Sequence, residues 1–197
     1  MNYIIFDMEW NQPFPKKKIL QIPIKLYGEI IQIAAVKVDE DLAQIDSFNE
    51  IVKPVYYTKM DREVSELTEI TEADLEEGRP FTDVITEFRE WMGEDGILMS
   101  WGPEDMRMLE DNLIVHDMDY DWLPEEVDAQ MLFDDLVTQE DRNFALSHAM
   151  YIMDIKPLRC HDALNDCMNT VEVLRKMDMA EDIKSYVMEW FEGDTAE

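Results

Sequence analysis

Glycine is scarce in this sequence, at 6 of 197 residues, and the glycine-rich patterns that hold phosphates are absent. The chain has no G-x-x-x-x-G-K-[ST] loop, no G-x-G-x-x-G fingerprint and no serine within a G-x-S-x-G elbow. Each of these patterns places backbone N–H groups or a nucleophile where a bound phosphate or acyl group needs them. Their absence argues against the common nucleotide-binding and serine-hydrolase classes.

Cysteine and long apolar runs are also lacking. The two cysteines, Cys160 and Cys167, do not form a C-x-x-C pair and have no further Cys or His pair to complete a zinc site, so we expect both to be reduced and partly buried. No apolar stretch approaches the roughly 18 residues of a membrane span, and the N-terminus has no basic signal-peptide region. We therefore expect a cytoplasmic protein with no membrane partner.

Basic residues are few, with 17 Lys and Arg against 46 Asp and Glu, so the formal net charge is −29. Such a charge repels nucleic acids and anionic membranes at long range. The acids are spread along the chain, which favours a solvated surface over an acidic segment that captures basic partners. With 46% hydrophobic residues, the length predicts one domain over residues 1–191, followed by an acidic tail at 192–197.

Strands are predicted mainly in the first half. An apolar run that begins at Tyr3 and the β-rich segment 29–38 read as buried strands, and 46–55 reads as the hairpin partner of the second. The proline- and lysine-rich segment 11–25 reads as a long loop. From 60 to 91 the pattern becomes helical, with apolar residues at three- and four-residue steps in Phe81, Val84, Ile85, Phe88 and Met92.

The second half reads mainly as helices. A short strand is expected at 96–100, helices at 104–114, 143–154, 163–177 and 181–191, and a short strand or turn at 128–136. Strands that come early and helices that come late, with some alternation, predict an α/β fold with a mixed sheet flanked by helices.

Two acids end the first strand. Asp7 and Glu9 are two residues apart, so in a strand both side chains project from the same face. Adjacent anions repel each other unless a cation lies between them, which suggests a metal site. Because acids make up 46 of 197 residues, this pair needs support from elsewhere in the chain.

Three further residues can supply that support. Asp105, in "SWGPED", falls in the opening turn of a helix directly after the strand at 96–100. His161 and Asp166 have H-x-x-x-x-D spacing, and five helical steps would point their side chains apart. They converge only if His161 lies in the turn before the helix, which the upstream Lys156–Pro157 pair favours.

Two alternatives occur in one acidic segment. His116 and Asp121 repeat the H-x-x-x-x-D spacing, but their segment has no helical periodicity and reads as a surface loop. The same segment mimics a calcium-binding EF-hand loop at Asp117, Asp119, Asp121 and Asp128. Trp122 stands where that loop needs glycine for its sharp turn, which argues against calcium.

Taken in order, Asp7, Glu9, Asp105, His161 and Asp166 resemble the DEDDh group of 3′–5′ exonucleases, such as ribonuclease T and the proofreading subunit of bacterial replicative polymerase. The intervening segments "EIIQIAAVKV", "ELTEIT" and "SWGPED" are also similar to that family. "SWGPED" most resembles the subgroup that trims histone mRNA and small RNAs. The resemblance extends from Tyr3 to about Met177 and implies a ribonuclease-H-like fold.

The resemblance implies two-metal catalysis. Four carboxylates are the hard oxygen ligands that Mg²⁺ or Mn²⁺ prefer over zinc. In the family pattern the residue at Asp7 bridges both ions, and those at Glu9 and Asp166 hold the ion that activates water. Asp105 would act partly through water, and His161 would be the general base, because imidazole exchanges protons near neutral pH.

The function implied is hydrolysis at the 3′ ends of single-stranded nucleic acid, RNA more than DNA, with release of nucleoside 5′-monophosphates. Two alternatives stay open: an acidic protein-interaction module on a degenerate nuclease scaffold, and an oligoribonuclease-like enzyme restricted to short oligonucleotides. The chain departs from the family at Glu69, usually Gly; at Trp10, often Thr; and at Cys167, usually Ala. The sequence does not identify protein partners.

Substrate contacts are expected from residues beside these motifs. By resemblance, Leu67 and Ile70 would pack against the terminal bases. A small positive rim for phosphates is expected from basic residues on both sides of the site: Lys16, Lys17 and Lys18 after the first acid pair, and Lys156 and Arg159 before His161. The expected binding residues are Met8, Trp10, Leu67, Ile70, Trp101, Lys16, Lys17 and Lys18.

Overall fold

The structure is a computed structural model that describes residues 2–13, 18–94, 96–140 and 142–193. Its centre is a six-stranded sheet in the order β6-β5-β4-β1-β7-β8. Strands β1, β4 and β5 pair antiparallel, whereas β7 pairs parallel with β1 and β8, and β6 pairs parallel with β5. The strands are β1 (Asn2–Asn11), β4 (Glu29–Val38), β5 (Gln44–Lys53), β6 (Arg79–Pro80), β7 (Gly96–Ser100) and β8 (Val127–Asp128).

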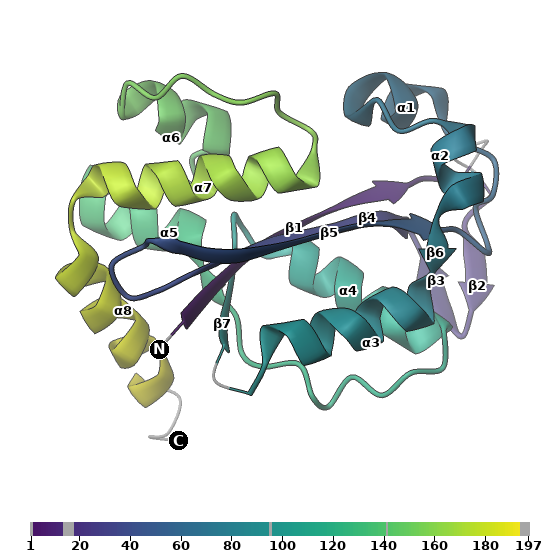
Figure 1. Ribbon diagram of the computed structural model, residues 1–197, viewed down its shortest axis with the longest axis horizontal. Helices are drawn as coiled ribbons and strands as arrows, with labels where there is room; N and C mark the ends of the chain where they lie inside the picture. The colour runs from purple at the N-terminus through teal and green to yellow at the C-terminus, as the bar shows by residue number, and fades with distance from the viewer. Residues whose placement is uncertain (1, 14–17, 95, 141, 194–197) are drawn as a thin grey trace.

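Helices cover both faces of this sheet (Figure 1). Helix α7 (Ala163–Met177) lies along one face, and α3 (Phe81–Met92) and α4 (Glu104–Val115) lie along the other. The expected mixed sheet flanked by helices is confirmed. The remaining helices are α1 (Arg62–Thr68), α2 (Glu72–Glu77), α5 (Ala129–Phe133), the π-helix η1 (Asp134–Thr138), α6 (Leu146–Ile152) and α8 (Ala180–Gly193).

The side chains of β1 alternate between the two faces of the sheet, and each face packs against its own layer of helices. Ile4 and Phe6 pack in the cluster that contains α3 and α4, whereas Tyr3 and Ile5 pack in the cluster that contains α7. The odd-numbered residues of β1 therefore face α7. Asp7, the next odd position, must point to that side.

The prediction of a long loop over residues 11–25 was wrong in part. The described part of segment 11–25 contains a hairpin of β2 (Leu20–Ile22) and β3 (Ile24–Leu26), which pair Leu20 with Leu26. Leu20, Ile24 and Leu26 bury their side chains against Tyr57 and Val115, and this burial gives the segment an ordered structure that prolines had argued against. Residues 14–17 lie outside the described residues.

The segment 128–136 is mostly helical, with α5 and then η1 following the two-residue strand β8. Its apolar residues Leu132 and Phe133 are fully buried in the α7 cluster. The last helix, α8, extends to Gly193 and is longer than the predicted 181–191 segment. Within the described residues, no helix is long and apolar enough to cross a membrane.

Candidate active site

Strand β1 presents the first two carboxylates. Asp7 pairs with Ala34 of β4 and Glu9 pairs with Gln32, and the ladder then shifts register between Glu9 and Trp10. Helix α7 starts above these positions, because the Ala163 N–H donates to Gln32 Oε1 at 3.4 Å. Both acids thus lie on the face of the sheet that is covered by the start of α7.

Asp105 is placed by the end of β7. Strand β1 pairs with β7 only as far as Ile5, and the chain leaves β7 through a turn at Gly102, whose φ is 93°. Helix α4 then begins, and Asp105 lies in its first turn, as predicted. Beyond the last β1–β7 pair, Asp105 Oδ1 accepts a hydrogen bond of 3.0 Å from the Met8 N–H. This bond fastens Asp105 beside the first acid pair.

His161 and Asp166 meet at the start of α7. Asp162 is the N-cap of this helix and accepts from the Asn165 N–H at 3.0 Å, so His161 lies in the preceding turn with φ 61°. Asp166 lies inside the helix, and its Oδ2 accepts from the His161 N–H at 2.7 Å. This is the local arrangement that convergence of the H-x-x-x-x-D pair required.

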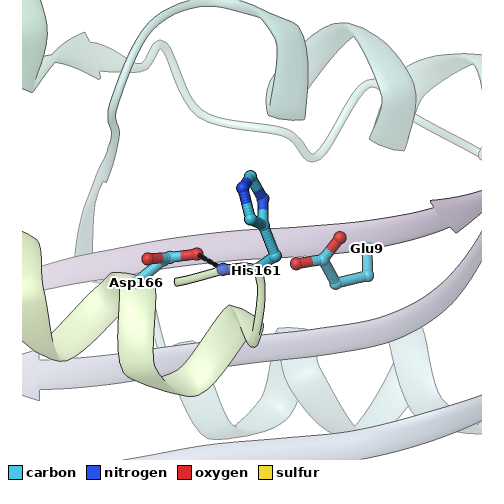
Figure 2. A group of neighbouring side chains, drawn as sticks. All are labelled: Glu9, His161 and Asp166. Atoms are coloured by element: carbon cyan, nitrogen blue, oxygen red, sulfur yellow. Dashed lines mark hydrogen bonds between the residues drawn. The ribbon is translucent and has the colours of Figure 1, made fainter. Parts of the chain in front are cut away.

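Ligand atoms of Glu9, His161 and Asp166 all lie within 4.8 Å of one another. Figure 2 shows the carboxylates of Asp166 and Glu9 on either side of His161, whose ring extends away from β1. The five predicted residues also line one pocket of about 270 Å³. The pocket is lined by Asp7, Met8, Glu9, Trp10, Gln12, Val64, Leu67, Thr68, Asp105, His161 and Asp166.

Three lining residues were missed from the sequence. Val64 lies three residues before Leu67 on α1, so the period of that helix could have indicated it once Leu67 was chosen. Thr68 lies four residues after Val64 and follows from the same period. Gln12 follows β1 directly. A polar residue after a strand end carried no signal by itself.

The expected substrate residues divide into two groups. Met8, Trp10 and Leu67 line the pocket. Ile70 is buried in a cluster with Met60 and Leu75 and is not among the lining residues. Trp101 is not among them either. Its indole N–H donates to the Phe144 carbonyl at 2.8 Å, and its ring packs against Phe133.

The expected basic rim is described only in part. Lys18, Lys156 and Arg159 are exposed, whereas Lys16 and Lys17 lie outside the described residues. The Arg159 guanidinium already donates to the Thr68 carbonyl and to Asp162.

The alternative histidine, His116, differs from His161 in its structural role. His116 caps the C-terminus of α4 and is half-buried, with its ring stacked on Phe81 at a centroid distance of 4.7 Å. Burial lowers the pKa of His116. It is therefore a packing residue, and the expectation of an ordinary surface loop residue was wrong.

Burial and mutual repulsion dominate the electrostatics of the carboxylates and outweigh the opposing effect of Arg159 on Glu9. Burial, followed by repulsion from Asp105 and Glu9, raises the pKa of Asp7 well above its ordinary value. Burial raises the pKa of Glu9 to about 8 and that of Asp105 to about 7. Burial also raises the pKa of Asp166, against the opposing effect of the His161 N–H bond. Ionised acids at this site need nearby cations.

The donor set fits hard divalent cations. Four carboxylates supply oxygen ligands, and Glu9, His161 and Asp166 already form a group with metal-binding proximity. Both cysteines are free, Cys160 half-buried and Cys167 buried, as expected. Carboxylate oxygen, the ligand type that predominates here, suits Mg²⁺ or Mn²⁺ better than zinc.

A fifth acid, Glu126, interacts with Asp105 and was not predicted from the sequence. Burial raises the pKa of Glu126 to about 7, and repulsion from Asp105 and Asp128 adds to this effect. The Ser100 hydroxyl donates to its carboxylate. The sequence before β8 gave no signal that Glu126 is buried near Asp105, because one more acid in so acidic a chain is unremarkable.

The fold and the pocket together define a class, that of hydrolases that gather carboxylates around a central strand of a mixed sheet to act on phosphodiesters. A model of the family described as exonuclease (RNase_T) matches residues 4–174 of the chain. The chain belongs to this exonuclease family.

Two curated relatives show how the chain compares with longer proteins. It is 31% identical to the PolC-type DNA polymerase III of Thermotoga petrophila over 91% of this chain and 13% of that protein. It is 23% identical to the probable 3′–5′ exonuclease KapD of Bacillus subtilis, over 89% of this chain and 83% of KapD. The chain thus spans a small part of PolC and most of KapD.

Solved structures share the fold. The nuclease domain of 3′hExo, a DEDDh family member bound to rAMP, has a TM-score of 0.78 at 19% identity and covers 92% of both chains. E. coli exonuclease I with a dA16 oligonucleotide has a TM-score of 0.69 at 15% identity, covering 92% of this chain and 41% of that one. These similarities confirm the ribonuclease-H-like fold.

Proposed function

We propose that this protein is an active 3′–5′ exonuclease of the DEDDh type, which hydrolyses single-stranded ends and releases nucleoside 5′-monophosphates. The observation that carries the proposal is the convergence of Asp7, Glu9, Asp105, Asp166 and His161 in one pocket. These residues come from β1, α4 and the start of α7, three segments that are far apart in the sequence. The membership of the chain in the exonuclease family supports the same conclusion.

The four carboxylates would hold two Mg²⁺ or Mn²⁺ ions. Such ions supply an activated water and neutralise charge at the leaving oxygen of a phosphodiester. In our proposal Asp7, Glu9, Asp105 and Asp166 together would hold these ions. Asp105 is held in place by the Met8 N–H, and Asp166 by the His161 N–H.

His161 would accept the proton of the attacking water. Its side chain is exposed at the pocket, which gives the imidazole a route to pass that proton to solvent. Imidazole is the side chain that most often serves as a general base in enzymes. In this proposal the carboxylates would hold the cations that compensate charge, and His161 would transfer the proton.

The β2–β3 hairpin would guide the strand that leads to the pocket. Residues 12–28 contain four lysines and no acid, in a chain of net charge −29. Lys25 and Tyr27 are exposed on the side of the hairpin opposite to buried Leu26. A Cβ built on Gly28 would lie 2.5 Å from Trp10 Cδ1, so the base of the hairpin packs against a residue of the pocket.

A small pocket with few basic residues suits a distributive trimmer that grips a few nucleotides. We propose RNA as the preferred strand, following the resemblance of "SWGPED" to the RNA-trimming subgroup. Solved neighbours include both an rAMP complex and a dA16 complex. A direct comparison of the two nucleic acids is therefore needed.

The test compares matched RNA and DNA strands labelled at the 5′ or the 3′ end, with Mg²⁺, with Mn²⁺ or with EDTA. We expect metal-dependent release of a labelled mononucleotide from the 3′-labelled strands at once, and a shortening ladder from the 5′-labelled strands. Asp83→Asn, which removes an exposed carboxylate on α3, is the matched control for Asp7→Asn. A folded protein without cleavage of either strand would favour the interaction-module alternative.

A further inference from the structure

The two walls of the pocket come from segments far apart in the sequence. Helix α1 supplies Val64, Leu67 and Thr68, and the turn before α7 supplies His161. Arg159, two residues before His161, spans these walls. Its Nη1 donates to the Thr68 carbonyl at 3.1 Å, across 91 residues of sequence.

The same guanidinium has two further partners. Its Nη2 donates to Asp162 Oδ2 at 2.9 Å, and its Nε lies 3.7 Å from Glu69 Oε2. Thr68 is the last residue of α1, where carbonyls lack helical partners and carry partial negative charge. Asp162 is the N-cap of α7. Arg159 therefore joins the end of one helix to the start of another.

Glu69 gives this arrangement a particular local cost. It caps α1 with φ 65°, the left-handed conformation that glycine adopts without a Cβ penalty. The related family usually has Gly at this position. In this chain the Glu69 side chain instead places a carboxylate beside the Arg159 guanidinium. That ion pair is exposed, so we assign most of the contact to the Thr68 and Asp162 hydrogen bonds.

The segment around His161 is held at several points. The Leu158 N–H donates to Asn169 Oδ1 at 2.9 Å, and the His161 N–H donates to Asp166. Both of these bonds tie the segment to α7. Arg159, between them, ties it to α1 instead. The segment that carries His161 is thus bonded both to α7 and to α1.

We propose that Arg159 is a positioning residue for His161. Its bonds to Thr68 and Asp162, with Glu69 alongside, form a clasp that holds the 155–162 segment against α1 and keeps the imidazole over the carboxylates. The catalytic part of this inference rests on the proposed function. The clasp itself is a property of the folded protein and can be measured without any substrate.

The first experiment measures amide hydrogen exchange in the metal-free protein. Arg159→Met should make residues 155–162 exchange severalfold faster, while the strands of the sheet stay unchanged. Arg159→Lys should lie between, because an ammonium cannot replace a planar fork that reaches three partners. The control is Arg62→Met, which removes the exposed ion pair of Arg62 with Glu66 on the same helix α1. Unchanged exchange in 155–162 would overturn the clasp.

The second experiment is a kinetic cycle with His161→Ala. In the wild-type background, Arg159→Met should lower kcat by about 10-fold to 10²-fold with little change in KM, as a small misplacement of a catalytic group does. In the His161→Ala background the same change should have no further effect. Equal losses in both backgrounds would show that Arg159 acts on something other than His161, and would overturn the positioning role.

The two experiments separate two kinds of failure. A wild-type protein that cleaves no strand would contradict the proposed function, and hydrogen exchange alone would then decide the clasp. A protein that cleaves normally and shows unchanged exchange in Arg159→Met would contradict the clasp and leave the function standing.

Discussion

Asp7 lies on the central strand between buried neighbours, where a carboxylate is costly. Burial and the nearby acids Asp105 and Glu9 raise its pKa, which means that the ionised form is disfavoured in the metal-free fold. A carboxylate at this buried position is better explained by the binding of a cation than by packing. The other three carboxylates, with raised pKa values, follow the same reasoning.

Asp7→Asn should abolish cleavage and raise the Tm of the metal-free protein near pH 8. The amide keeps the shape of the side chain and cannot ionise, so the repulsion disappears together with the binding of metal. Melting curves in EDTA and cleavage in saturating Mg²⁺ measure the two effects. Cleavage at the wild-type rate in Asp7→Asn would show that the carboxylate pocket is not the catalytic centre.

His161→Ala should lower the cleavage rate by about 10² to 10⁴, the usual contribution of a general base. The exposed His148 on α6 is the matched control, and His148→Ala should cleave normally. His116→Ala is a poor control because it would remove the stack on Phe81 and lower stability. If His161→Ala and His148→Ala lose equal activity, the base lies elsewhere.

At the scale of elements, the sequence predicted those helices and strands whose hydrophobic period is clear. Helix α3 is one example, because Phe81, Val84, Ile85, Phe88 and Met92 are all buried as the period required. The turn that holds His161 was also predicted, because geometry left only one way for His161 and Asp166 to meet. Local pattern therefore sufficed for most of the site.

Elements that depend on distant partners were missed. The β2–β3 hairpin exists because Leu20, Ile24 and Leu26 bury themselves on Tyr57 and Val115, which are far away in the sequence. Ile70 was expected at the substrate because it belongs to a motif, but it packs under α1 and α2. Arg159 showed no sign of its partners, since Thr68 is 91 residues away. Tertiary contacts of this kind have no periodic signature.

The hairpin should contribute to strand binding by neutralising phosphates. Replacing Lys18 and Lys25 together with alanine should weaken binding of a single-stranded oligonucleotide and reduce the slope of log affinity against log salt, by about 0.7 for each phosphate that is no longer neutralised. Replacing Lys37, which instead contacts Trp91 by the α3 side of the sheet, is the control. An unchanged salt slope in the double variant would place the strand on another surface.

At the scale of the whole molecule, the acidic site couples stability to pH. Each raised carboxyl pKa means that the folded protein binds that proton more tightly than the unfolded chain does. The stabilisation is complete below the ordinary pKa values of 3.8 and 4.5, and it is lost as pH rises through about 7 for Asp105 and about 8 for Glu9.

The metal-free protein should therefore lose stability between about pH 5 and pH 8, and Mn²⁺ should raise its Tm more at pH 8 than at pH 5. Ionised carboxylates bind the cation, and the cation removes their repulsion. Denaturation curves in EDTA and in Mn²⁺ across this range measure both effects. A metal-free stability that increases over the same interval would contradict the electrostatics of the pocket.

The net charge of −29 also affects the association of the whole molecule with a nucleic acid strand, because both are anionic. Most of the surface repels a nucleic acid strand, so in our proposal association depends on the pocket, on cations bound there and on the lysines of residues 12–28. Long strands should therefore be released between cleavage steps. With a competitor trap and limiting enzyme, we expect partial shortening of each strand. Complete degradation in one encounter would contradict a distributive enzyme.

Removal of nucleotides from 3′ ends by the carboxylate pocket is tested most directly by time-resolved mass spectrometry of an unlabelled RNA oligonucleotide. We expect products that shorten one nucleotide at a time from the 3′ end, together with nucleoside 5′-monophosphates, in Mg²⁺ and not in EDTA. Shortening from the 5′ end, internal fragments, or cleavage that persists in EDTA would contradict this role of the pocket.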